Sequence, residues 1–222
     1  MRIALLGGTG DVGEGLALRW ARDTDHAVVV GSREEEKAGR RVEEYRSRLE
    51  ERNVACDLEG ASNGEAVRDA DVVVASVPPG YVVDTLEGVA DALPDDAVVV
   101  SPAVRMDRDG AGFHYDPPER GSVAELAADA VDDDVSLVGA FQNVAAGALR
   151  DLDSELDADV VVTGDDAEAK ALVSELAEEI EGIRALDGGP LATTGLVESM
   201  TPLLINLAMN NDGMHDLGVK FQ

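Results

Sequence analysis

A glycine-rich turn near the start of the chain constrains the fold more than any other feature. Gly8, Gly10 and Gly13 form the pattern GxGxxG, which follows the apolar run Ile3–Leu6 and opens a segment of helical spacing, 10–22. A dinucleotide-binding unit requires this strand–loop–helix order, because glycines permit a tight turn and a close approach of backbone to a pyrophosphate. The helix start adds N–H groups and positive dipole character. The turn therefore predicts a Rossmann-type fold that binds a dinucleotide, although a purely structural turn would show the same glycines.

Two polar residues within this turn have different expected roles. The hydroxyl of Thr9 can donate to a phosphate, or it can serve only to form the turn. Asp11 carries the wrong charge for a pyrophosphate neighbour, so we expect its side chain to face solvent.

Apolar runs alternate with helical segments along the first part of the chain. We expect strands at 27–30, 54–58, 72–77, 97–100 and 135–141, and helices at 33–52, 82–93 and 122–131. Such alternation is typical of a parallel sheet that is covered on both faces. The prediction is an α/β protein whose doubly wound sheet, residues 1–141, is the cofactor domain.

The regular alternation of strands and helices changes near residue 142, and residues 142–222 are predicted to form a smaller α/β lobe. Its expected elements are helices at 143–149, 166–181 and 194–211 and strands at 160–163 and 183–186. Pro202 should kink the last helix or mark its true start. The apolar face of that helix must be covered, by the first domain or by a second subunit.

Three residues after the second strand indicate which dinucleotide is bound. An NAD site wants an acidic residue there to hold the ribose 2′-hydroxyl. This chain has Ser32 and Arg33 instead, with Lys37 one helical turn later. A serine hydroxyl and two cations suit a phosphate, so we predict NADP. For the other bases of 33–52 we favour surface pairs such as Glu36–Arg40 and Glu44–Arg48.

Residues that follow the later strands are the remaining cofactor-binding candidates. They are Val77, Pro78, Pro102 and Ala140. In an open parallel sheet, ligands lie outside the carboxyl ends of strands. The two prolines are explained about as well by a purely structural role, in which they only shape the loops after the strands.

No residue pattern predicts a metal site, a nucleophile or an acid–base pair. The three histidines lack ligand spacing, and the single cysteine, Cys56, lies beside Asp57, which disfavours a thiolate. A site without these groups suits a reaction between two bound cofactors, in which the protein mainly positions reactive carbons.

The charge of the chain narrows its partners and its habitat. With 46 acidic and 18 basic residues, a net charge of −28 and 3% aromatics, nucleic acid and anionic membranes are unsuitable partners. Bases are almost all arginine, with lysine only at Lys37, Lys170 and Lys220. The acidic groups repel one another, and molar salt screens this repulsion beyond about 3 Å. We therefore predict that the protein works in the salt-rich cytoplasm of an extreme halophile. No targeting or membrane-spanning segment is expected.

Longer stretches of the chain resemble a known family. RIALLGGTGDVGEGLALR, VVVGSREEEKA, LDGGPLATTGLVESMTPLLINL and LGVKF are similar to the archaeal NADPH-dependent reductases of the deazaflavin coenzyme F420. The resemblance implies direct hydride transfer between NADP(H) and F420 in a homodimer, with NADP held by the glycine turn and by Ser32, Arg33 and Lys37. It also implies that Ser199 and Thr201 act near the deazaflavin.

Two departures from the family pattern concern the deazaflavin site. Gln142 stands where the family often has histidine and can still hydrogen-bond, so it joins the catalytic candidates. Gly195 stands where the family often has arginine, and it cannot replace a cation. Two other functions therefore stay open: an NADP-dependent reductase of a flavin, metal ion or small imine, and a non-enzymatic NADP sensor.

Overall fold

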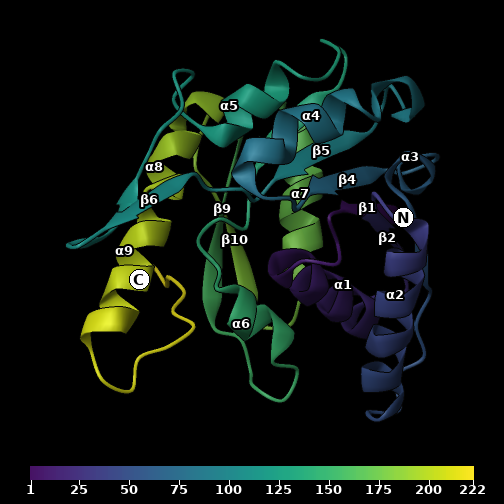
Figure 1. The fold of residues 1–222 in the computed structure, drawn as a ribbon, viewed down its shortest axis with the longest axis horizontal. Coiled ribbons are helices and arrows are strands. Elements are labelled where there is room, and N and C mark those ends of the chain that lie inside the picture. The colour runs from purple at the N-terminus through teal and green to yellow at the C-terminus, as the bar shows by residue number, and fades with distance from the viewer.

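One large sheet organises the molecule, which is a computed structural model of all 222 residues. Its strands are β1 (Arg2–Leu6), β2 (Ala27–Ser32), β3 (Leu58–Ser62), β4 (Val72–Ala75), β5 (Val98–Ser101), β8 (Ser136–Gly139), β9 (Ala158–Gly164) and β10 (Ile183–Asp187). They follow the order β10-β9-β8-β5-β4-β1-β2-β3 (Figure 1). Neighbouring strands are parallel except for β8 and β9, which are antiparallel.

Helices cover both faces of this sheet. The helices of the chain are α1 (Asp11–Asp23), α2 (Glu35–Glu50), α3 (Asn63–Ala66), α4 (Val82–Glu87), α5 (Val123–Ala128), α6 (Ala146–Arg150), α7 (Ala167–Glu178), α8 (Thr194–Glu198) and α9 (Met200–Asn210), of which α9 packs mainly on a separate hairpin rather than on the sheet. Successive residues of a strand point to opposite faces, so Leu5 packs in the core under α1, α2 and α7, and Leu6 in the core under α4 and α5. Both cores are apolar, which confirms the predicted doubly wound α/β fold. No helix combines the length and hydropathy that a bilayer crossing requires.

The strands after residue 142 join the sheet of the first half. β9 pairs with β8, and β10 pairs with β9, at the edge away from β3. The division into domains 1–141 and 142–222 stays a prediction. The predicted apolar helix 194–211 is broken at Ser199, and Pro202 is the third residue of α9, where a missing N–H costs little.

One local prediction was wrong, and one element was missed. The third strand lies at 58–62 rather than 54–58, because it is a polar edge strand whose position is set by pairing with β2. A hairpin of β6 (Met106–Asp109) and β7 (Gly112–Tyr115) was not predicted. The side-chain amide of Asn206 in α9 binds both backbone groups of Phe113, accepting at 2.8 Å and donating at 2.7 Å. The hairpin is thereby fixed to α9.

The topology decides where a ligand can bind. β1 lies between β2 and β4, so the chain leaves it toward one side first and returns to the other later. Ligands of open parallel sheets bind at such a switch point, outside the carboxyl ends of the strands. Most of the predicted cofactor-binding residues follow β1, β2, β4, β5 and β8, and therefore lie along this edge.

Candidate functional site

The glycine turn joins β1 to α1 through backbone that only small residues allow. Gly7, which sequence reasoning did not single out, has a φ of 74°, and a Cβ there would lie 2.6 Å from Val77. A Cβ on Gly13 would lie 2.5 Å from the Cα of Gly8. Gly13 therefore lets α1 pack directly against the turn, as the third glycine of the pattern should.

The start of α1 is open to a ligand. Gly10 precedes the helix in an extended conformation, and no side chain caps the first turn. Asp11, the first residue of α1, has a side chain that is 74% exposed and pairs with Arg150 at 2.7 Å, as its predicted solvent-facing position requires. The uncapped N–H groups of a 13-residue helix are thus available to an anion.

A polar cleft of about 720 Å³ lies beside the turn. Its walls come from the segments that end β1, β2, β3 and β4, from the start of α2, and from α4 and the residues on either side of it. The lining residues are Gly7, Thr9, Gly10, Ser32, Arg33, Lys37, Ser62, Asn63, Gly64, Ser76, Val77, Pro78, Tyr81, Asp84, Thr85, Gly88 and Val89. The structure therefore brings together Thr9, Gly10 and the three residues predicted to bind a phosphate.

The two cations of this cleft have no acidic partner, unlike most bases of the chain. Along the same segment, Arg46 pairs with Glu43 at 2.5 Å and Arg52 with Asp153 at 2.8 Å. Arg33 and Lys37 are exposed and have no carboxylate within 4.0 Å. In a chain with a net charge of −28, two adjacent unpaired cations make a local site for an anion.

One of the two predicted surface pairs forms. Arg40 and Glu36 lie 3.9 Å apart. Arg48 does not meet Glu44; it pairs at 2.6 Å with Glu14 of α1. Glu14 is 8% exposed, and a carboxylate that deeply buried needs charged partners.

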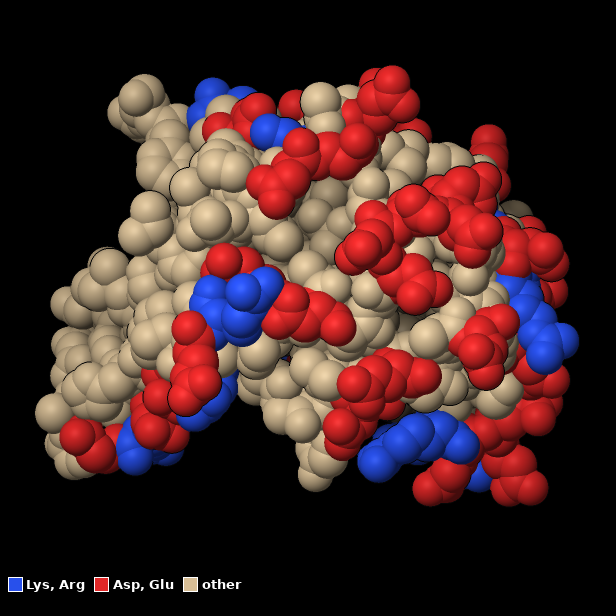
Figure 2. Space-filling model, turned by 90° about the horizontal axis from the view of Figure 1, so that it is seen from above, with Lys and Arg blue, Asp and Glu red and all other residues tan.

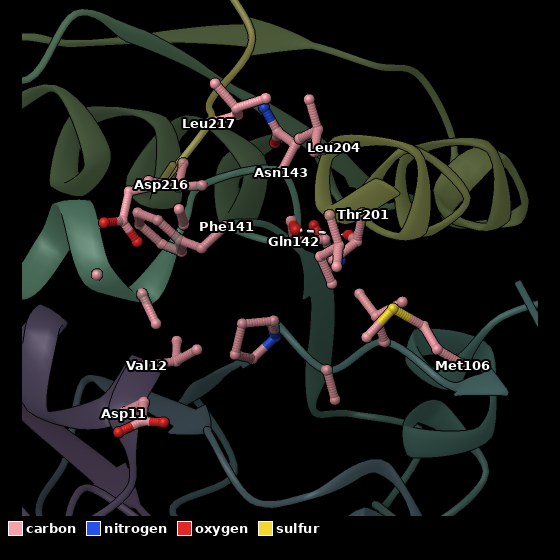
Figure 3. Close-up of a pocket in the computed structure, with 18 of the residues that line it drawn as sticks. Asp11, Val12, Met106, Phe141, Gln142, Asn143, Thr201, Leu204, Asp216 and Leu217 are labelled. Carbon is pink, nitrogen blue, oxygen red and sulfur yellow. Dashed lines mark hydrogen bonds between the residues drawn. The ribbon is translucent and has the colours of Figure 1, made fainter. Parts of the chain in front are cut away.

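An apolar cleft of about 790 Å³ continues from the polar one. The two clefts share Gly10, Ser76, Val77 and Pro78. Beyond these shared residues, the walls come from the segment after β5, from the segment after β8, from α9 and from the chain that follows α9 (Figure 3). A ligand with a polar, anionic end and a flat apolar end therefore fits along one continuous trough.

Gln142 occupies the wall of the apolar cleft in a strained turn. The preceding Phe141 has a φ of 70°, unusual for a bulky residue, and packs edge-to-face on Trp20 at 5.7 Å. The amide nitrogen of Gln142 donates to the carbonyl of Ser101 at 2.9 Å, and its amide oxygen is buried with no partner. An orphaned acceptor beside a cleft costs stability and suits a donor on a ligand.

Thr201 fixes this turn from α9. Its hydroxyl donates to the backbone carbonyl of Gln142 at 2.7 Å, and the residue lines the same cleft (Figure 3). Thr201 is therefore placed to hold Gln142 against whatever the cleft binds.

The other predicted residues lie in different surroundings. Pro102 lines the apolar cleft, and Ala140 is fully buried behind it. Ser199 lines neither cleft; its hydroxyl donates to the carbonyl of Leu196 at 2.7 Å, so its catalytic role stays a prediction. Gly195 also lies outside both clefts, where a Cβ would be 2.8 Å from the carbonyl oxygen of Gly121.

Glu198 is a buried carboxylate that sequence reasoning did not select, although it selected the next residue, Ser199. It accepts the backbone N–H groups of Val123 and Ala124 at 2.8 and 3.3 Å and the hydroxyl of Tyr115 at 3.0 Å. Burial outweighs these donors and raises the pKa of Glu198 to about 7. The residue ties α8 to the start of α5 and to the β6–β7 hairpin.

We expect Glu198 to make the folding stability depend on pH near neutrality. Because its pKa rises from 4.5 to about 7 on folding, the folded state holds the proton more tightly. Stability is therefore greatest below pH 4.5 for this group and falls as the pH rises to 7, by at most about 3 kcal/mol. Urea unfolding of wild type and Glu198→Gln at constant KCl, from pH 5 to 8, checks this. A stability difference between the two proteins that stays constant with pH would contradict it.

The chain after α9 returns across the apolar cleft and is tied down at its end. Met214 to Leu217 line the cleft. Asp159 of β9, fully buried, accepts the Phe221 N–H at 2.7 Å and two bonds from Arg184 at 2.6 and 2.9 Å. The Arg184 guanidinium holds the pKa of Asp159 low, at about 2, so this anchor stays ionised at neutral pH.

Known proteins share this sequence nearly end to end. Residues 2–105 match the family described as coenzyme F420-dependent NADP oxidoreductase. The F420-dependent NADP reductase of Methanocaldococcus jannaschii is 39% identical over 213 residues, 93% of this chain and 92% of that protein. The protein of the same name from Methanothermobacter marburgensis is 39% identical over 214 residues, 95% and 94% of the two chains.

Solved structures share the fold. A crystal structure from Arthrobacter sp. FB24, whose proposed identity is an F420-dependent NADP reductase, matches with a TM-score of 0.81 and 24% identity, over 100% of this chain and 99% of that one. A pyrroline carboxylate reductase from Plasmodium falciparum matches with a TM-score of 0.55 and 12% identity, over 84% and 58%. At these identities the likeness concerns the fold alone.

Proposed function

Because the chain belongs to the F420-dependent NADP reductases, we propose that its two joined clefts hold NADP(H) and coenzyme F420 for direct hydride transfer. The observation that carries this assignment is the continuity of the clefts at Gly10, Ser76, Val77 and Pro78. At that junction, the nicotinamide end of one coenzyme can meet the ring of the other.

The residues present fit NADP(H). Gly7, Gly8 and Gly10 let the backbone approach a pyrophosphate closely, the hydroxyl of Thr9 can donate to it, and the uncapped start of α1 adds N–H groups. Ser32 is 7% exposed, and its hydroxyl oxygen already accepts the Glu34 N–H at 3.2 Å, which leaves its proton free to donate. With Arg33 and Lys37, it supplies donors for a ribose 2′-phosphate.

The apolar cleft fits the flat ring of a deazaflavin. Its walls include Met106, Leu204 and Ile205, and the unpaired amide oxygen of Gln142 offers an acceptor for a ring N–H. No lysine or arginine lines it; its ionisable groups are Asp11, His215 and Asp216. We therefore expect the acidic tail of F420 to extend out of the cleft, with molar salt screening the repulsion.

The protein contributes position and exclusion of water. When bound, the nicotinamide supplies or receives at its C4 the hydride that F420 exchanges at its C5, and no general acid or base is required. The glycine turn, Arg33 and Lys37 fix one coenzyme, while α9 and the chain after it cover the other. Thr201 and Gln142 set the wall of the apolar cleft against which the deazaflavin ring would lie.

Thr201→Val should impair hydride transfer more than NADP binding. Valine keeps the shape but leaves the Gln142 carbonyl without its 2.7 Å hydrogen bond. Because this bond positions the cleft wall, we expect up to its whole value, about 1.5 kcal/mol, to be lost from the transition state, which corresponds to about tenfold in kcat. Single-turnover kinetics and NADP⁺ titration check this, and Thr201→Ser should restore most of the rate. Unchanged turnover would remove Thr201 from the site.

A second copy of the chain is the proposed partner. Leu196, Leu203 and Leu207 of α8 and α9 are 73%, 57% and 41% exposed. The one charged residue between 190 and 211 is the buried Glu198, while acidic side chains crowd the end of the molecule far from α9 (Figure 2). Mutual repulsion therefore opposes association least at this face. We propose that it forms an isologous homodimer contact.

The assignment is tested by mixing the protein with NADPH and oxidised F420 in molar KCl and following the deazaflavin absorbance. Flavin mononucleotide and NADH serve as controls. We expect bleaching only with NADPH and F420, at a rate that rises with KCl, as the net charge of −28 and the proposed salt-rich cytoplasm require. Tight NADP⁺ binding without bleaching would contradict the assignment and favour another acceptor or a sensor.

A further inference from the structure

The polar cleft has a wall that the phosphate-binding residues do not explain. It is formed by Asn63, just after β3, and by Tyr81, in the turn between β4 and α4. Asn63 follows β3, which pairs with β2 so that Ser62 lies opposite Ser32. Tyr81 follows β4, on the other side of β1, and its ring lies beside the guanidinium of Arg33. A base attached to a ribose at β2 reaches this region.

Asn63 carries an amide that the protein leaves unused. Its oxygen is buried without a hydrogen-bond partner, one of three such side-chain atoms, with those of Ser101 and Gln142. It lies against Gly31, where a Cβ would come within 2.9 Å of it. Leaving a buried amide oxygen unpaired is unfavourable, and no hydrogen bond would be broken if the amide turned toward the cleft.

Tyr81 offers a flat face at the same place. It is 55% exposed, although aromatic residues make up only 3% of the chain. The guanidinium carbon of Arg33 lies 5.8 Å from the centre of its ring. Exposed aromatic rings and guanidinium groups are the side chains on which nucleic acid bases stack in other proteins.

We propose that Asn63 and Tyr81 recognise the adenine base of NADP(H), an inference that rests on the proposed function. Tyr81 stacks on the face of the base. The amide of Asn63 turns to accept a hydrogen bond from the 6-amino group and to donate one to N7. Asparagine reads adenine through this pair of bonds wherever the two are coplanar.

The test compares NADP⁺ with its hypoxanthine analogue, in which a carbonyl replaces the 6-amino group. Isothermal titration in molar KCl should show that wild type binds NADP⁺ roughly tenfold more tightly than the analogue. Asn63→Ala should bind the two with nearly equal affinity. The ratio of the affinities is measured within one protein, so a general loss of stability does not change it. Equal affinities in wild type, or an unchanged ratio in Asn63→Ala, would overturn the role of Asn63.

Tyr81 is tested with adenosine 2′,5′-bisphosphate, which lacks the nicotinamide half. Tyr81→Ala should weaken its binding by roughly tenfold, and Tyr81→Phe should bind it like wild type, because stacking needs the ring and not the hydroxyl. Unchanged binding by Tyr81→Ala would overturn the stacking role. These titrations need neither F420 nor turnover, so they can fail while the hydride-transfer assay succeeds, and the reverse.

Discussion

Replacing Arg33 by aspartate is expected to weaken NADP⁺ binding by at least about 100-fold while leaving NAD⁺ binding unchanged or stronger. Arg33 is exposed, lines the polar cleft and has no carboxylate partner, so its charge is available to the 2′-phosphate. A charge-assisted hydrogen bond to phosphate contributes about 1.5–3 kcal/mol. Aspartate removes it, repels the phosphate and can accept the 2′-hydroxyl of NAD⁺ instead.

A matched control separates this local effect from the change in net charge. Arg40 lies two turns further along α2, pairs with Glu36 at 3.9 Å and is exposed outside both clefts. Arg40→Asp therefore alters the total charge by the same amount, and it should change the affinity for NADP⁺ less than twofold. Isothermal titration in molar KCl measures both variants. Equal NADP⁺ affinity in wild type and Arg33→Asp would refute the 2′-phosphate assignment.

The parts of this site that the sequence predicts are those with a local signal. The glycine turn, Ser32 and Arg33 follow buried strands, and a buried strand is visible as an apolar run. Their place at the carboxyl ends then follows from the parallel topology. The β6–β7 hairpin also has a signal, because the pair Asp109-Gly110 marks turns in general; the loop itself is Gly110-Ala111, since Asp109 pairs with Gly112.

Other parts depend on contacts between distant segments. The positive φ of Phe141 follows from packing on Trp20 and from the bond between Thr201 and the Gln142 carbonyl. Neither of these contacts produces a repeating pattern in the sequence from which it could be predicted. Glu198 has the same limitation: a glutamate between valine and serine gives no sign that three donors from two other elements surround it.

Leu203→Asp is expected to convert the protein from a dimer to a monomer. In an isologous contact the same residue enters from both copies, so one substitution introduces two carboxylates. Each copy also loses about 1–2 kcal/mol, the part of a leucine's burial that its exposed 57% can contribute, and desolvating each carboxylate costs several kcal/mol more. The dissociation constant should rise on the order of 10³-fold or more. Light scattering after gel filtration should give about 46 kDa for wild type, twice the 23.2 kDa chain, and one chain for the variant.

Activity measured on the same samples ties this face to the reaction. Leu204, Ile205 and Ala208 line the apolar cleft from the other side of α9, so a partner on the Leu203 face would hold the cleft wall in place. Leu203→Asp should therefore lose turnover with F420 and keep NADP⁺ affinity, since the polar cleft contains no residue of α9. Ala171→Asp, exposed on α7, adds the same charge away from α9 and should stay dimeric and active. A monomeric wild type at micromolar concentration, or a dimeric Leu203→Asp, would contradict the proposed contact.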